Sequence, residues 1–464
     1  MKELTSGNPA KVIFAFSVPI IIGNLFQQLY SMIDTIIVGR TIGVDAIAAL
    51  GSTSYISTLI IGFMSGLTNG FSIITARHYG AGDNVKMRRS VAGTIIIGLA
   101  VSAVLTVASI FFIKPFMHLL NTPADIFDEA YSYISVTLFF MVTAMLYNMS
   151  AGVLRAVGDS ITPLVFLIIS SAMNVGLDIL FIAKFGMGVS GAAYATIISQ
   201  AASFILCCIY IVIRFPYLIP KPEEFKITWE EVWELFSMGL SLALMFSLVE
   251  IGSLILQRAI NDFGTKTIAA HTAARKISSI LMLPYTAFGS ACATYCSQNI
   301  GAGRPDRAGK GVKSSILMAW VWSAAAVIIG YVFSPYIVSW IAGTDEQYIV
   351  DLASKYMRVN TPFYFVLAVL IVLRSSLQGL GRKAVPVASS IIEMVGKAVI
   401  AFTAAPALGY FGVMISEPIV WIFMTILLII GYASDKQLME ATFGKKKISS
   451  KATAVLFIRL HSAT

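Results

Sequence analysis

Charged side chains are scarce in this sequence. Only 12% of its 464 residues are Asp, Glu, Lys or Arg, whereas 57% are hydrophobic and the mean hydropathy is +0.82. A soluble domain carries roughly a quarter charged residues. The composition therefore excludes a large soluble domain and predicts a polytopic membrane protein.

Cysteine and histidine are also rare, with four of each. The cysteines, Cys207, Cys208, Cys292 and Cys296, all lie in apolar runs, which favours buried packing over a disulfide framework. The sequence around Cys292 and Cys296 holds no His or carboxylate cluster, so we expect no metal site there. An HExxH motif is also absent. A membrane-embedded enzyme is therefore the least favoured function.

The net charge of +9 is the one feature that suggests nucleic acid as a partner. In a membrane protein, however, surplus Lys and Arg usually mark the cytoplasmic loops. We therefore expect no nucleic-acid partner and interpret the charge as a signal of topology.

Long apolar runs are abundant, and a spanning helix needs about 20 mostly apolar residues. Twelve runs qualify, at residues 12–38, 46–74, 90–113, 128–150, 161–183, 188–213, 232–259, 267–297, 312–334, 354–373, 385–405 and 409–433. With the N-terminus placed in the cytoplasm, 22 Lys and Arg fall in the inner segments and seven in the outer segments and their span edges. This bias predicts a multi-pass protein of the plasma membrane with both termini cytoplasmic.

An internal repeat divides the chain into two copies. Gly80 and Gly82 of "YGAGD" recur as Gly301 and Gly303 of "IGAGR", at an offset of 221 residues. Each copy contains six spans, so the two have the same orientation and are related by an axis along the membrane normal. We predict two pseudo-symmetric six-helix lobes around a central cleft, divided as follows: an N-terminal lobe 1–213, a cytoplasmic linker 214–230, a C-terminal lobe 231–435 and a basic cytoplasmic tail 436–464.

Five polar residues of the first lobe fall at one depth in the predicted spans. At a rise of 1.5 Å per residue, they occupy one layer about 8 Å thick in the outer half of the membrane. These residues are Asp34, Tyr133, Asn174, Asp178 and Thr196. We therefore expect Asn174 and Asp178, which share a helix face, to find partners on other helices.

Two carboxylates close together in a low-dielectric interior cannot both stay charged without a bound cation. Asp34 and Asp178, with the amide of Asn174 and the hydroxyl of Thr196, form a set of hard oxygen ligands suited to Na⁺, and the same set holds a proton. For Asn174 and Thr196 alone, hydrogen bonding between helices is the favoured interpretation. Pro19, 15 residues before Asp34 in the first span, is a candidate hinge.

The second lobe is chemically different. In this part of the chain the repeat offset is 223 residues, after a small insertion, and Asn174 corresponds to Lys397 and Asp178 to Ala401. Glu393 and Lys397 are four residues apart, and we interpret them as a structural pair on one helix. Glu250 has no obvious helical partner and is a candidate second proton site or substrate contact. His271 is interpreted as a buried, hydrogen-bonded histidine.

The stretches "SVPIIIGNLFQQLYSMIDTIIVGRTIGVDAIAALG" and "VLRAVGDSITP" and the paired "GAG" turns resemble the multidrug and toxic compound extrusion (MATE) family of secondary transporters. The resemblance covers about residues 8 to 435. It implies a twelve-helix, V-shaped antiporter that expels organic cations or amphipathic drugs against inward Na⁺ or H⁺.

The resemblance also implies roles for individual residues. It implies that the first-lobe ion site consists of Asp34, Asn174, Asp178 and Thr196, that Tyr133 lies beside them and that Pro19 bends the first span. Glu250 resembles an acid of a second-lobe site found in some branches. That site looks incomplete here, because the tenth span has no acid before Arg374.

The favoured function is a monomeric exporter of a small molecule, with H⁺ or Na⁺ as coupling ion and no cofactor. The alternative is a flippase for lipid-linked precursors from the same superfamily. Such a flippase needs a strongly cationic cleft, for which Arg374 and Lys397 are the available residues.

Overall fold

The computed structural model describes residues 4–119, 122–343 and 346–434, so the predicted tail at 436–464 lies outside the described residues. Within these ranges every regular element is a helix. The first half of the chain forms α1 (Pro9–Thr41), α2 (Val44–Gly80), α3 (Asn84–Leu119), α4 (Phe127–Phe139), α5 (Met141–Ala156), α6 (Ile161–Asp178) and α7 (Val189–Arg214). The second half forms α8 (Trp229–Asn261), α9 (Thr265–Gly301), α10 (Pro305–Ile328), α11 (Ser334–Ala342), α12 (Gln347–Asn360), α13 (Tyr364–Gly379), α14 (Ala384–Phe402), α15 (Ala404–Leu408), α16 (Tyr410–Met414) and α17 (Ser416–Ala433).

The predicted fold class is confirmed. Eleven helices of the described chain are long and apolar enough to cross a membrane, and the number is twelve if the bent pair α4 and α5 counts as one span. The predicted run at 128–150 is not one straight helix, because α4 and α5 meet at Phe140 with a bend of 45°. The sequence around Phe140 contains no Pro or Gly, so no local signal marks this break.

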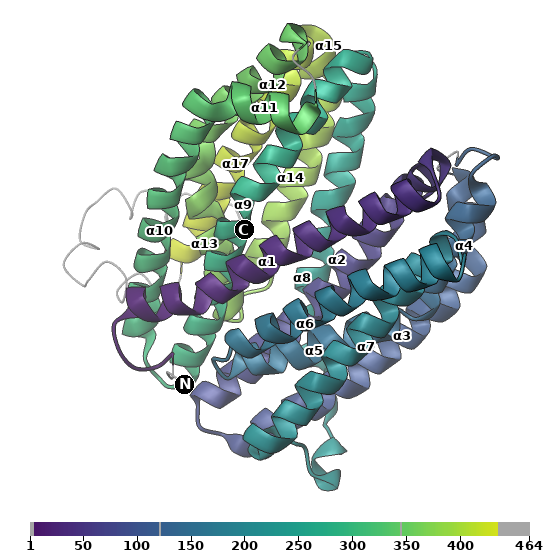
Figure 1. The fold of residues 1–464 in the computed structure, drawn as a ribbon. Coiled ribbons are helices and arrows are strands. Elements are labelled where there is room, and N and C mark those ends of the chain that lie inside the picture. The colour runs from purple at the N-terminus through teal and green to yellow at the C-terminus, as the bar shows by residue number, and fades with distance from the viewer. Residues whose placement is uncertain (1–3, 120–121, 344–345, 435–464) are drawn as a thin grey trace, which may run out of the picture.

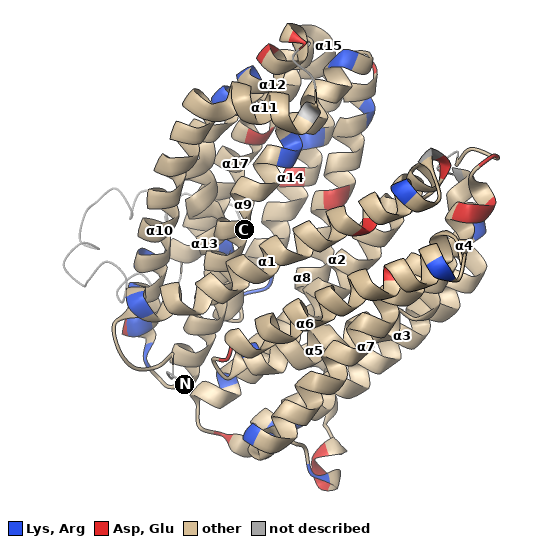
Figure 2. Ribbon diagram, in the orientation of Figure 1, with Lys and Arg blue, Asp and Glu red and all other residues tan. Residues whose placement is uncertain are grey.

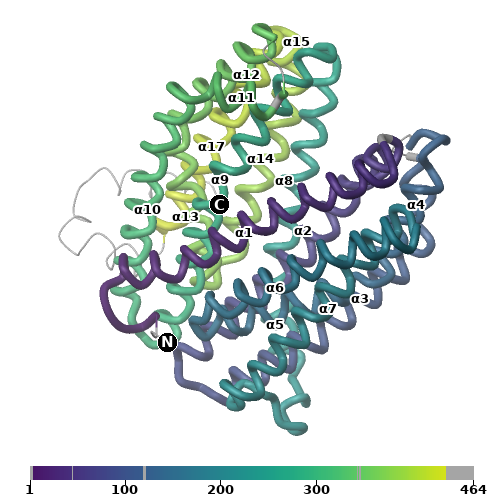
Figure 3. The backbone as a smooth tube through the Cα atoms, in the orientation of Figure 1, coloured from purple at the N-terminus to yellow at the C-terminus, as the bar shows by residue number. Residues whose placement is uncertain are grey.

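The helices form two bundles that make a V (Figure 1). Helices α1–α7 make the first bundle and α8–α17 the second, and the two come together near the N-terminus and diverge toward the opposite end, as the smooth trace in Figure 3 also shows. Charged residues gather mainly at the helix ends and leave most of the helix lengths uncharged (Figure 2). This distribution is expected of helices whose middle portions lie in lipid.

The two repeated "GAG" turns hold the bundles together at their closed end. Gly82 and Gly303 take φ values of 69° and 68°, which glycine adopts without strain. A Cβ atom on Gly80 would lie 2.0 Å from the backbone oxygen of Gln298, and one on Gly301 would lie 2.0 Å from that of Arg77. Because Gln298 follows Arg77 by the repeat offset of 221, these two close contacts are equivalent under the pseudo-symmetry.

Hydrogen bonds between the bundles reinforce the same region. Ser297 Oγ donates to the Ile73 carbonyl at 2.6 Å, and Gln298 Nε2 donates to the Ala156 carbonyl at 2.6 Å. Both donor side chains, Ser297 and Gln298, are fully buried. Further along, α2 and α8 approach so closely that a Cβ on Gly70 would lie 2.5 Å from Gly239 Cα. Small residues at such positions let helix backbones pack closely in membranes.

Two ion pairs connect the start of α3 to the segment between α7 and α8 and to the first turn of α8. Arg88 Nε donates to both carboxylate oxygens of Glu224 at 2.8 Å, and Arg89 Nη2 pairs with Glu231 at 2.7 Å. The hydrogen bonds from Arg88 hold the pKa of Glu224 below its ordinary value. The pair is therefore intact at neutral pH, and its contribution is lost only when the pH falls through that lowered pKa.

The first prediction concerns the close packing at Gly80. Replacement by Ala forces a methyl group against the Gln298 backbone, and overpacking of this kind costs about 1–3 kcal/mol. We expect Gly80→Ala to lower the thermal unfolding midpoint of the detergent-solubilised protein. Gly51→Ala is the matched control on α2, since its Cβ would meet nothing within 4 Å. Equal midpoints for the two variants would contradict the close packing.

The second prediction concerns the α7–α8 segment. Arg88→Gln removes the bidentate partner of Glu224, so we expect trypsin to cleave faster after the exposed Lys226. Lys86→Gln is the control, because its ion pair with Asp83 spans 3.9 Å on the surface. Mass spectrometry of the fragments measures the rate. An unchanged rate in Arg88→Gln would show that the pair does not order this segment.

Candidate ion-binding site

Two acidic side chains from the first bundle meet where the bundles diverge. Asp34 lies on α1, seven residues before that helix ends, and Asp178 is the last residue of α6. The chain continues from Asp178 as a π-helical turn at Ile179–Lys184. Such turns are frequent at functional sites because they redirect side chains out of the regular helical register. The two carboxyl groups lie close enough to share a hydrogen bond when one of them is protonated.

Three of the four carboxylate oxygens of this pair are buried and lack donors. Asp34 is 8% exposed, Asn174 is 2% exposed and Asp178 is completely buried. Asp34 Oδ1, Asn174 Oδ1 and both carboxylate oxygens of Asp178 form no hydrogen bond within the described chain. Four buried acceptors without donors are costly in a protein interior, so the arrangement fits a cation or a proton as the missing partner.

Asn174 links the carboxylates to a third helix. It lies one turn before Asp178 on α6, and its Nδ2 atom donates to Thr196 Oγ1 on α7 at 3.4 Å. This bond orients the amide so that its oxygen stays available. The structure thus brings Asp34, Asn174, Asp178 and Thr196 together from three helices, as the matched depths predict.

No basic residue of the described chain forms an ion pair with either carboxylate. If both were ionised, the site would carry two uncompensated negative charges away from water. Removal of each ion from water costs several kcal/mol unless an opposite charge is present. A bound Na⁺ or a shared proton removes this cost, and the carboxylate, amide and hydroxyl oxygens are the ligands that hard cations take.

Two tyrosines complete the surroundings of the pair. Tyr133 on α4 was singled out from the sequence, and the structure places it within electrostatic reach of both Asp34 and Asp178. Tyr30 was missed, although it lies within the same reach and is one helical turn before Asp34. The spacing of four residues in "YSMID" is the signal that identifies it. Both are half-buried.

Pro19 is buried within α1, and the helix continues through it from Pro9 to Thr41. Proline removes the hydrogen bond to the carbonyl four residues earlier, which makes a helix easier to bend at that point. Its role as a moving hinge stays a prediction.

The second bundle contains the ion pair that was predicted on α14 and a second ion pair that was not predicted. Lys397 Nζ lies 2.9 Å from Glu393 Oε1, and His271 Nδ1 lies 3.0 Å from the hydroxyl of Tyr410, so both interpretations are confirmed. Arg275 forms an ion pair with Glu417, which the sequence did not reveal because α9 and α17 are far apart in the chain.

Glu250 is half-buried on α8 and makes no hydrogen bond or ion pair with other described residues. The structure therefore leaves it open as a proton site or substrate contact.

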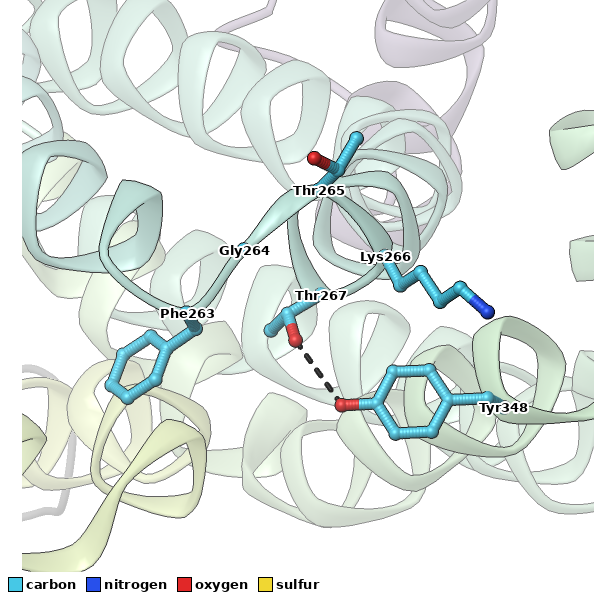
Figure 4. Close-up of a pocket in the computed structure, with 6 residues that line it drawn as sticks. All are labelled: Phe263, Gly264, Thr265, Lys266, Thr267 and Tyr348. Atoms are coloured by element: carbon cyan, nitrogen blue, oxygen red, sulfur yellow. Dashed lines mark hydrogen bonds between the residues drawn. The ribbon is translucent and has the colours of Figure 1, made fainter.

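A surface pocket of about 410 Å³ lies in the second bundle, at the connection between α8 and α9 (Figure 4). It is lined by Phe263, Gly264, Thr265, Lys266, Thr267 and Tyr348. Thr267 Oγ1 and the Tyr348 hydroxyl are 3.2 Å apart, and Lys266 is paired with Glu346. The pocket includes no carboxylate among its lining residues and belongs to a different bundle from Asp34 and Asp178, so it forms no part of this site.

Comparison with known proteins agrees with this architecture. The family model described as MatE matches residues 19–180 and again residues 241–403, one match in each bundle. The chain is 28% identical to "Probable multidrug resistance protein YpnP" of Bacillus subtilis, over 82% of this chain and 84% of that protein. It is 27% identical to "Probable multidrug resistance protein YoeA" of the same organism, over 90% and 92%.

A solved structure, "Crystal structure of MATE in the bent conformation", superimposes with a TM-score of 0.86 at 23% identity and covers 96% of this chain and 98% of that one. This likeness shows the fold. Since the family model matches most of the chain, the chain belongs to the MatE family, the multidrug and toxic compound extrusion family that its sequence resembles, whose members are membrane transporters and not enzymes.

Proposed function

We propose that the protein exports organic cations or amphipathic drugs in exchange for H⁺ or Na⁺, by alternating access of one central site to the two sides of the membrane. The observation that carries this proposal is the buried pair Asp34 and Asp178, three of whose four carboxylate oxygens lack donors in the described chain. The names of the relatives from Bacillus subtilis, probable multidrug resistance proteins, support small drugs as the cargo.

Exchange follows from competition for the same negative charge. A cationic drug is attracted to the site while the carboxylates are ionised, and a bound proton or Na⁺ removes that attraction. Binding of the coupling ion and binding of the drug therefore oppose each other. If the coupling ion also binds the outward-facing and inward-facing states with different affinity, its gradient drives the drug outward.

Both coupling ions fit the same atoms. Na⁺ would take oxygens of Asp34, Asp178 and Asn174, with Thr196 Oγ1 as a further ligand. A proton would need only the two carboxyl groups, one of which would then donate to the other. The two mechanisms differ in their dependence on Asn174 and Thr196, since only the Na⁺ site requires neutral oxygen ligands.

Alternating access also needs the closed end of the V to open. In this structure the bundles meet at Gly80 and Gly301, and they diverge toward the C-terminal end of α1, the helix that carries Asp34 (Figure 1). We place the closed end in the cytoplasm of the cell, because the basic residues favour both termini on that side of the plasma membrane. The structure then corresponds to an outward-facing monomer.

The third prediction is that Asp34→Asn abolishes drug efflux from cells and leaves expression intact. Asparagine keeps the shape of the side chain but removes the charge that binds both drug and coupling ion. Asp262→Asn is the matched control, since Asp262 is an exposed residue that follows α8. Dye accumulation in cells measures efflux, and immunoblotting of membranes measures expression. Wild-type efflux by Asp34→Asn would remove Asp34 from the coupling site.

A further inference from the structure

The two bundles touch at the closed end of the V through two helix contacts that the repeat makes equivalent. One is the α2–α8 contact and the other is the α1–α9 contact. Under the offset of 221 residues, Arg77 on α2 corresponds to Gln298 on α9. In the same way, Glu234 on α8 corresponds to Ile13 on α1. The two contacts therefore share a helix arrangement but differ in the polarity of their side chains.

The α1–α9 contact is apolar and is reinforced by hydrogen bonds. Ile13 is completely buried and packs in one hydrophobic cluster with Ala291 and Tyr295 of α9. The chain before α1 also accepts three hydrogen bonds from side chains around the turn between α9 and α10. These bonds join Asn299 to the Leu4 carbonyl, Arg304 to the Thr5 carbonyl and Arg307 to the Gly7 carbonyl, at 3.2, 3.0 and 3.1 Å. Separation of the bundles here would break these bonds and expose apolar side chains to water.

The α2–α8 contact ends instead in an ion pair that water partly reaches. Arg77 Nη1 lies 3.4 Å from Glu234 Oε1, and the two side chains are 24% and 41% exposed. The guanidinium of Arg77 also lies against the turn between α13 and α14, since a Cβ atom on Gly381 would lie 3.2 Å from its Cζ atom. Arg77 therefore reaches from the first bundle to two elements of the second.

Both members of this pair have another partner available if the bundles separate. Arg77 Nε and Nη2 are buried and form no hydrogen bond within the described chain, so separation lets them bind water. Glu234 lies within electrostatic reach of His78, which belongs to the first bundle, and of Lys383, which belongs to the second. Lys383 is held beside α8 by its hydrogen bond to Ser237 Oγ. Glu234 thus keeps a cation of its own bundle after Arg77 leaves.

We propose that Arg77 and Glu234 form the latch of the cytoplasmic gate, and that the bundles separate at the α2–α8 contact while the α1–α9 contact stays closed. The inference rests on the proposed function, because alternating access requires the closed end of the V to open. A switching contact needs two arrangements that are close in free energy. The partly hydrated ion pair meets this condition better than the apolar, hydrogen-bonded α1–α9 contact.

The test measures hydrogen–deuterium exchange of the full chain in lipid nanodiscs by mass spectrometry. Backbone amides exchange when local opening exposes them, so their rates report how often a contact opens. The peptides compared are residues 71–82 at the end of α2, 376–385 at the α13–α14 turn and 292–303 at the end of α9. We expect Arg77→Gln and Glu234→Gln each to accelerate exchange in the first two peptides about threefold, the effect of losing a partly exposed ion pair. The third peptide should be unchanged.

Two further variants control for effects other than the loss of the latch. The double variant that combines Arg77→Glu with Glu234→Arg re-forms the pair with its charges exchanged, so its exchange should be slower than in either single variant. Lys310→Gln is the matched control, because its ion pair with Asp306 spans 3.8 Å within α10 and does not join the bundles. We expect wild-type exchange in this control.

Three results would overturn the inference. Unchanged exchange in both single variants would show that the pair does not hold the contact. Acceleration confined to residues 71–82 would be fraying of α2 alone. Equal acceleration in residues 292–303 would mean that the two contacts open together. Because the assay needs neither a drug nor an ion gradient, each of these results leaves the proposed exchange of drug for ion to its own test.

Discussion

The architecture depends on the cost of placing two carboxylates side by side out of water. Asp34 and Asp178 have no basic partner in the described chain, and three of their four oxygens are buried without donors. Such a pair is stable only when it holds a proton or a cation. The exchange that we propose needs a group that binds a small cation and releases it when another positive charge arrives, and this pair is our candidate for that group.

The rest of the fold keeps this pair separate from the contact between the bundles. Asp34 lies near one end of α1, and Gly80 lies at the far end of α2, roughly 40 Å away along the helix axes. The junction at Gly80 and Gly301 is made of close backbone contacts that are equivalent under the repeat. The chemistry does not obey the repeat, since Asn174 corresponds to Lys397. The two repeats thus have similar backbones but carry different side chains at corresponding positions.

Much of the fold and part of the candidate site were predictable from the sequence. The number of spans follows from apolar length, and the equal height of Asp34, Asn174, Asp178 and Thr196 in the membrane follows from the antiparallel order of the spans. Depth does not fix direction around a helix, so the pair Arg275–Glu417 and the proximity of Tyr30 needed coordinates. The break at Phe140 had no local signal, because no Pro or Gly lies near it in the sequence. The lobe boundaries and the roles of Pro19 and Glu250 stay predictions.

The most direct test reconstitutes the purified protein in liposomes and follows efflux of a cationic dye under sodium and proton gradients imposed one at a time. The account predicts that at least one gradient accelerates efflux by the wild type and that neither does so in Asp178→Asn. Wild-type efflux that ignores both gradients, or an Asp178→Asn variant that still responds to one, would contradict the claim that this carboxylate pair holds the exchanged ion.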